Sequence, residues 1–178
     1  MDLSIMPECY ADTLMIETFV PPAIRYNHKH SCSQVENEML RGKLKDKFAV
    51  GIIDKDKRSI QYLSEFEEKD SVAGSLILWR HKSKEKHHFI IQIQPALEKW
   101  ILDICLSESI DLGELPNDLD KLKLYTKKQA SLENESLKTL FTKMSERNEN
   151  ASIRKLKGWI KLLKEKNYNV DINELINV

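Results

Sequence analysis

The amino-acid sequence predicts an α/β fold in which a mostly parallel β-sheet is flanked by helices and followed by a helical C-terminal extension. Over roughly the first hundred residues, short apolar runs alternate with segments of helical character, the order typical of α/β domains. Residues 48–53 form a continuous apolar run, which suits a strand buried on both faces of a parallel sheet. After Gly113 no strand pattern is found. We therefore predict an α/β domain over 1–112 and a helical extension over 113–178 packed on it.

Prolines and charged loops divide the N-terminal third into short elements. The first apolar run stops at Pro7. A helix that begins near Asp12 or Thr13 must end before Pro21, because proline disfavours helical backbone in the residue before it. The predicted elements are, in order, a strand over 3–6, a helix over 12–20, a strand over 23–26, a helix over 33–45 and a strand over 48–53.

The rest of the chain holds two more predicted strands and several helices. Pro95 opens one helix, since proline fits a first helical turn. The last helix carries an apolar face, which indicates a helix docked on its own domain; a membrane-surface or partner-binding helix is the alternative. The predicted elements are a short helix over 60–68 with an acidic turn after it, strands over 75–79 and 88–93, and helices over 95–105, 119–144 and 153–166.

Composition excludes several classes of protein. The 178 residues include 28 Lys and Arg and 28 Asp and Glu, so binding of nucleic acid by bulk charge alone is excluded. Three cysteines without a CxxC pair predict neither a disulfide framework nor a thiolate zinc site. No apolar run reaches the roughly 20 residues of a membrane helix, and no secretory signal is recognised. We therefore expect a cytoplasmic protein without membrane contact.

Carboxylates follow two of the predicted strands. Glu8 comes after the first strand, and Asp54 and Asp56 come after the most apolar one. Functional groups of open α/β sheets collect beyond the carboxyl ends of the strands, so these three should share one edge. Carboxylate oxygens and water are the ligands that Mg²⁺ and Mn²⁺ prefer. A solvated charged turn is the alternative for Asp54 and Asp56.

The pattern resembles the Toprim family of metal-dependent nucleases, topoisomerases and primases over roughly residues 1–100. The residues that carry the resemblance are Glu8-Cys-Tyr-Ala-Asp12-Thr13 and Ile52-Ile-Asp54-Lys-Asp56. The resemblance implies that Glu8 acts as general acid or base and metal ligand, and that Asp54 and Asp56 hold Mg²⁺ or Mn²⁺. It implies that Asp12 orients the first turn. Cys9 stands where the family usually has glycine.

Further residues could complete such a site. Glu98 follows a predicted strand, and some Toprim nucleases resemble this in carrying a further Glu that could help hold a second metal ion. The alternative is a carboxylate that merely stabilises the first turn of a helix. Cationic side chains near the acidic edge are candidates for contact with phosphate, although ordinary surface charge is the alternative; they are Lys55, Lys57, Arg58, His28 and His30.

These residues predict Mg²⁺-dependent hydrolysis of DNA or RNA phosphodiesters. The chain has no P-loop, so ATP dependence would have to come from an ATPase partner protein, as in the anti-phage systems that small Toprim proteins resemble. The alternative is a non-catalytic Toprim-like module that binds a partner. Convergence of Glu8, Asp54 and Asp56 would distinguish the two. The sequence leaves open DNA or RNA, endonuclease or exonuclease, and monomer or homodimer.

Overall fold

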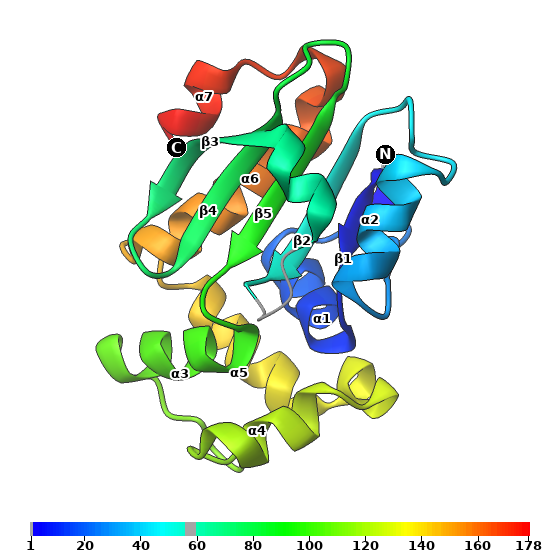
Figure 1. Cartoon of the computed structure of the whole chain (residues 1–178). Helices are drawn as coiled ribbons and strands as arrows, with labels where there is room; N and C mark the ends of the chain where they lie inside the picture. The colour runs from blue at the N-terminus through cyan, green and yellow to red at the C-terminus, as the bar shows by residue number, and fades with distance from the viewer. Residues whose placement is uncertain (1, 56–59) are drawn as a thin grey trace.

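The computed structural model describes residues 2–55 and 60–178 and contains a five-stranded sheet (Figure 1). The strand order across the sheet is β1-β2-β5-β4-β3. Strands β1, β2 and β5 run parallel to one another, whereas β4 and β3 are antiparallel to their neighbours. The strands are β1 (Ile5–Pro7), β2 (Ala49–Asp54), β3 (Phe66–Val72), β4 (Leu76–His81) and β5 (His88–Ile93).

The α/β class is confirmed, but the sheet is mixed, because β4 runs antiparallel to both β5 and β3, and one of the strands was not predicted. Residues 66–72 were predicted as the end of a helix and an acidic turn, yet they form edge strand β3. Most of its side chains are at least partly exposed, so no apolar alternation marks it in the sequence. Charged side chains are typical of edge strands, where they discourage pairing with other chains.

The strand predicted over 23–26 is wrong in the described structure, although the chain just after it runs beside β1. The Asn27 amide donates a hydrogen bond to the Ile5 carbonyl at 2.9 Å, and the Lys29 amide donates to the Pro7 carbonyl at 2.9 Å. These two bonds hold the segment against the outer edge of β1. They place His28, which lies between them, close to the end of that strand.

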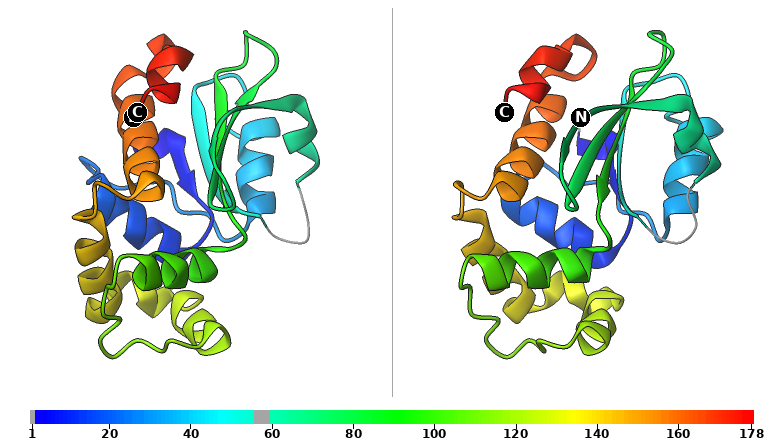
Figure 2. Two further views of the ribbon diagram at one scale, coloured as in Figure 1. Left: turned by 90° about the vertical axis from the view of Figure 1, so that its left-hand side faces the viewer. Right: turned by 60° about the vertical axis from the view of Figure 1, so that its left-hand side comes forward.

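Helices cover both faces of the sheet and its lower end (Figures 1 and 2). Helix α2 lies on one face and α6 on the other, and α3, α4 and α5 lie beyond the ends of β2 and β5. The helices are α1 (Tyr10–Phe19), α2 (Cys32–Leu40), α3 (Leu97–Ser107), α4 (Leu119–Thr126), α5 (Glu135–Ser145), α6 (Ala151–Lys166) and α7 (Ile172–Ile176). Short 3-10 turns flank or connect several of them, including Gln61–Glu65 and Gln129–Glu133.

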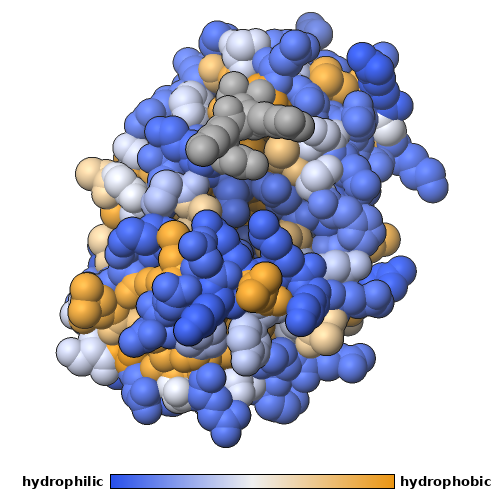
Figure 3. Space-filling model, turned by 60° about the horizontal axis from the view of Figure 1, so that its bottom comes forward, coloured by the Kyte–Doolittle hydropathy of each residue, from blue (hydrophilic) through white to orange (hydrophobic). Residues whose placement is uncertain are grey.

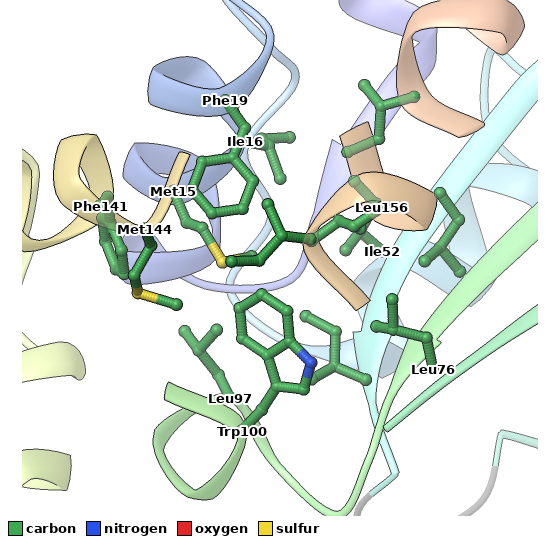
Figure 4. Close-up of a cluster of buried hydrophobic side chains, with 14 of the residues drawn as sticks. Met15, Ile16, Phe19, Ile52, Leu76, Leu97, Trp100, Phe141, Met144 and Leu156 are labelled. Atoms are coloured by element: carbon green, nitrogen blue, oxygen red, sulfur yellow. The ribbon is translucent and has the colours of Figure 1, made fainter. Parts of the chain in front are cut away.

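The larger core lies between the sheet and helices α1, α3, α5 and α6 (Figure 4). Alternation along β2 sends Val50 and Ile52 into this core and Ala49 and Ile53 into a smaller core beneath α2. Gly51 is needed on the α2 side, because a Cβ there would lie 2.7 Å from Cγ1 of Val35. Burial on both faces explains the unbroken apolar run in the sequence.

The C-terminal helices belong to this same core. The apolar face predicted for the last helix is fully buried in α6, which confirms docking on the chain's own domain; its residues are Ile153, Leu156, Ile160 and Leu163. Residues on both sides of position 112 share the larger core, and the division at that position stays a prediction. Among the described helices, none combines the length and the apolar character needed to cross a membrane.

Candidate acidic site

A cavity of about 510 Å³ lies at the carboxyl ends of the parallel strands. Five segments contribute to its walls: the turn after β1 with the start of α1, the segment before α2, the end of β2, the start of α3, and α4 with the residue that follows it. Its lining residues are Glu8, Cys9, Tyr10, His28, His30, Asp54, Ala96, Glu98, Lys123 and Lys127. The site therefore gathers acidic, imidazole and ammonium groups from both parts of the chain.

Glu8 is held against the neighbouring strand by two hydrogen bonds. Its backbone amide donates to the Ile52 carbonyl at 3.0 Å, which continues the β1–β2 pairing by one residue. Its carboxylate oxygen Oε2 accepts from the Asp54 amide at 3.0 Å. The side chain therefore turns back across the end of β2 and approaches the backbone of the second acidic residue.

Asp54 is the last residue of β2 and connects that strand to α3. Its Oδ1 accepts a hydrogen bond from the Leu97 amide at 3.0 Å. Leu97 is the first residue of α3, where backbone amides lack partners within the helix and favour a negative charge. The side chain of Asp54 is thus fixed at the junction of β1, β2 and α3.

Asp12 is the third residue of α1 and forms a capping box with Cys9, the residue before the helix. The Cys9 amide donates to Asp12 Oδ2 at 3.1 Å, and the Asp12 amide donates to Cys9 Sγ at 3.4 Å. Asp12 is only 1% exposed, and its Oδ1 has no hydrogen-bond partner among the described residues. Asp12 therefore completes the capping box of α1, and one of its two buried oxygens has no partner among the described residues.

Glu98 lies in the first turn of α3 and is buried. Its Oε1 accepts a hydrogen bond from the Thr126 hydroxyl at 2.5 Å. Thr126 is the last residue of α4 and is fully buried. This contact ties the helical part of the chain directly to the acidic cavity, which sequence analysis did not anticipate.

The four carboxylates perturb one another. Burial, followed by the negative charges of Asp12, Glu8 and Glu98, raises the pKa of Asp54 well above its usual value. Burial is also the main reason that the pKa of Asp12 is raised, with Glu8 and Glu98 adding to the effect. Such shifts follow from carboxylates that share a site of low polarity. Ionisation of Asp54 and Asp12 is therefore opposed by burial and by the neighbouring carboxylates.

The same environment suppresses thiolate chemistry at Cys9. Burial and the nearby Asp12 charge raise the pKa of the thiol far above its ordinary value. A reactive cysteine needs a lowered pKa, because the thiolate is the nucleophile. Cys9 therefore serves as the cap of α1 and not as a nucleophile.

Two histidines and a tyrosine form the other wall of the cavity. The Tyr10 and His28 rings stack with centroids 4.2 Å apart, and His30 meets both rings edge-on. The Thr13 hydroxyl donates to the Cys9 carbonyl at 2.8 Å, so it can only accept from His28 Nδ1, which lies 2.9 Å away. Neutral His28 therefore carries its proton on Nδ1, and its Nε2, 3.3 Å from His30 Nδ1, is the basic nitrogen.

The remaining predicted residues are placed as follows. Asp56, Lys57 and Arg58 lie outside the described residues. Lys55 is exposed, and its Nζ lies 3.5 Å from Oε1 of Gln94. Among the residues that the structure describes, no group of three or more His, Cys, Asp or Glu side chains is arranged to hold a metal ion.

Sequence analysis missed the contribution of α4. Lys123 and Lys127 line the cavity and Thr126 anchors Glu98, although these residues lie more than a hundred positions after Glu8. The only local signal is the spacing of four between the two lysines, which puts them on one face of a helix. Contact with the acidic edge depends on how α4 packs, and the sequence pattern does not specify this.

Comparison with known proteins identifies no relative of this chain. No protein-family model, curated protein or solved structure matches it.

Proposed function

We propose that the acidic cavity binds a divalent metal ion, Mg²⁺ or Mn²⁺, and hydrolyses phosphodiester bonds of nucleic acid in the manner of a Toprim nuclease. One observation carries the proposal: carboxylates from separate elements gather in one cavity at the carboxyl ends of parallel strands, where burial and mutual repulsion raise the pKa values of Asp54 and Asp12. Ligand sites of open α/β sheets occur at this edge. Perturbed carboxyl groups in a cavity are typical of functional sites.

The chemistry of the donor set fits a hard divalent cation. Asp54 and Glu8 would hold it, with Glu98 and the predicted ligand Asp56 as further donors, because oxygen ligands are what Mg²⁺ and Mn²⁺ prefer. A bound cation would favour the ionised form of Asp54, which burial and the neighbouring carboxylates disfavour in its absence, and Oδ1 of Asp12 is a buried oxygen without a hydrogen-bond partner among the described residues. When bound, the ion supplies polarisation of a phosphate oxygen and activation of water.

The chain's own residues would position the reactants and move protons. Glu8 is fixed by the Asp54 amide and would accept the proton of the attacking water on its carboxylate. Asp54 is fixed by the Leu97 amide and would keep the metal-binding edge rigid. His28 presents a basic Nε2 toward the same cavity and would donate a hydrogen bond to a substrate phosphate once protonated.

Metal binding and cleavage test this proposal together. Calorimetry with Mg²⁺ and Mn²⁺ on the EDTA-treated chain, with cleavage of plasmid DNA and of RNA on the same samples, should show metal-dependent hydrolysis. Asp54→Asn and Glu8→Gln should each lose cleavage by at least about a hundredfold, since both keep the hydrogen-bond acceptor and lose the charge. Asp103→Asn, on the exposed face of α3, is the control and should remain active.

Two outcomes would contradict the proposal. If the chain binds neither Mg²⁺ nor Mn²⁺ at millimolar concentration, the nuclease proposal is wrong and the non-catalytic binding module remains. Cleavage that persists in Asp54→Asn would assign the activity to another site or to a contaminant. An ATPase partner and a role in anti-phage defence stay predictions, which co-purification from the native host would test.

A further inference from the structure

We infer that α4 is the phosphate-binding element of this site, with Lys123 and Lys127 contacting backbone phosphates that flank the scissile one. The inference rests on the proposed function and assigns its substrate-binding part to the helical region. Both ammonium groups line the cavity that contains Glu8, Asp54 and Glu98. No other lysine or arginine among the described residues lines it.

The two lysines are presented by one face of α4. A spacing of four residues places side chains one turn apart on the same side of a helix. The adjoining side of α4 is anchored by Leu122 and Thr126, both fully buried. The helix also begins at a fixed point, because the Asp118 side chain accepts from the Lys121 amide at 2.9 Å. The lysines therefore project from a helix whose orientation is set.

Thr126 sets the position of α4 relative to the carboxylates. Its hydroxyl donates to Glu98 Oε1 across the α3–α4 interface, and both residues are buried. Thr126 lies between the two lysines in the sequence, so the contact fixes both of them beside the acidic edge. The position of the two lysines relative to the proposed metal-binding carboxylates is therefore fixed.

The positive charge of these lysines is available to a ligand. Within the part of the chain that the structure describes, Lys127 has no ion-pair partner within 4.0 Å. Lys123 lies 3.5 Å from Asp120, whose side chain is 91% exposed, and an exposed pair of this kind contributes little. Lysines with a purely structural role would pair with the cavity carboxylates, whereas Glu98 accepts a hydrogen bond from Thr126.

Backbone phosphates are the ligand that this arrangement favours. Carboxylates alone repel a nucleic acid, so binding needs cations at the rim to hold the phosphates on either side of the cleaved bond. Lysine acts as a point charge toward phosphate without selecting a base. The contacts should therefore set affinity and its salt dependence, equally for all sequences.

Figure 3 views the end of the molecule at which α3 and α4 lie, where hydrophilic side chains surround the centre and a hydrophobic area lies to one side.

Two other lysines of the same helical region provide a matched control. Lys121 and Lys128 are exposed on or just after α4 but do not line the cavity. Their replacement removes the same charge from the same helical region. Comparison with this control therefore distinguishes a specific phosphate site from a general effect of charge.

Salt-dependent binding of a fluorescein-labelled single-stranded DNA, and of an RNA of the same sequence, tests the inference by anisotropy in EDTA and in Ca²⁺. The variant Lys123→Gln/Lys127→Gln should bind about tenfold more weakly, and the slope of log K against log salt should fall by about 1.4, because each phosphate contact on a single strand contributes about 0.7. The control Lys121→Gln/Lys128→Gln should change the slope by less than half of that. Thermal unfolding checks that both variants fold.

Three results would overturn the inference: no binding of either strand by the wild-type chain, an unchanged slope in the cavity variant, or an equal loss in the control. The cleavage assay distinguishes failure of this inference from failure of the proposed function. If Asp54→Asn abolishes cleavage while the cavity variant binds normally, only the assignment of α4 is wrong. If the cavity variant loses binding but no chain cleaves, α4 binds phosphates and the hydrolytic proposal is wrong.

Discussion

Asp54→Asn should stabilise the metal-free protein even though it removes a residue proposed to be essential. The substitution keeps an oxygen in the place of Oδ1, so the hydrogen bond from the Leu97 amide can remain. It removes one negative charge from a cavity in which Asp12, Glu8 and Glu98 also lie close to Asp54. The variant therefore avoids both the repulsion between carboxylates and the cost of burying a charge. This gain in stability should outweigh any change in packing.

The expected magnitude follows from the raised pKa of Asp54. Burial and the neighbouring carboxylates raise that pKa from 3.8 to about 9, and removal of one unfavourable buried charge is worth on the order of 1–3 kcal/mol. At pH 8 the variant should therefore gain about 1–3 kcal/mol in its free energy of unfolding. For a chain of this length that equals a rise of about 2–10 °C in Tm.

The effect should depend on pH with a defined sign. Because the pKa of Asp54 is higher in the folded than in the unfolded chain, the folded state binds more protons between the two values. The contribution of this group to stability is therefore full at acid pH and declines as the pH rises above about 4. Asp54→Asn should remove that decline, by up to about 1.4 kcal/mol per pH unit.

Urea denaturation in EDTA between pH 5 and pH 8.5 measures both quantities for wild type, Asp54→Asn and the exposed control Asp103→Asn. Added Mg²⁺ should stabilise wild type and have much less effect on Asp54→Asn, since a ligand of the folded state raises its stability. A variant that is less stable than wild type at pH 8, with an unchanged pH dependence, would refute the argument that the cavity stores unbalanced negative charge.

Two further predictions concern the core beneath α2. Gly51→Ala should destabilise the protein by about 1–3 kcal/mol in urea denaturation, because the new Cβ would lie 2.7 Å from Cγ1 of Val35; Val35→Ala in the same chain should recover part of the loss, and no recovery would contradict the steric reason. Tyr62→Phe should cost about 1–3 kcal/mol, because the Tyr62 hydroxyl donates to buried His88 Nδ1 at 2.7 Å; an unchanged midpoint would show that this nitrogen finds another partner.

The parallel part of the sheet and the docked last helix were predictable from local patterns. Apolar run length marks β2 and β5 as strands buried on both faces, and a period near four marks the buried face of α6. Edge strand β3 was missed because its side chains are largely exposed and charged. This strand forms because it pairs with β4, and the pairing does not require an alternation of apolar and polar residues in the sequence.

The candidate site was likewise predictable only in part. Glu8 and Asp54 were found because an acidic residue directly after a strand must lie at the end of that strand, and parallel strands bring those ends together. The burial of Asp12, the approach of His28 to Thr13 and the contact between Thr126 and Glu98 were not predictable. Each of these joins residues from different elements, or depends on how those elements pack.

The sequence by itself determined the α/β class, the parallel direction of β1, β2 and β5 and the place of Glu8 and Asp54 at the ends of their strands, since each follows from periodicities and connection rules that act along the chain. Only the tertiary structure decided that the helical region completes the cavity with Lys123 and Lys127 and that the carboxylates there perturb one another. The physical reason is that charge repulsion and burial depend on distances in space. Segments far apart in the sequence acquire such distances only when the helices pack.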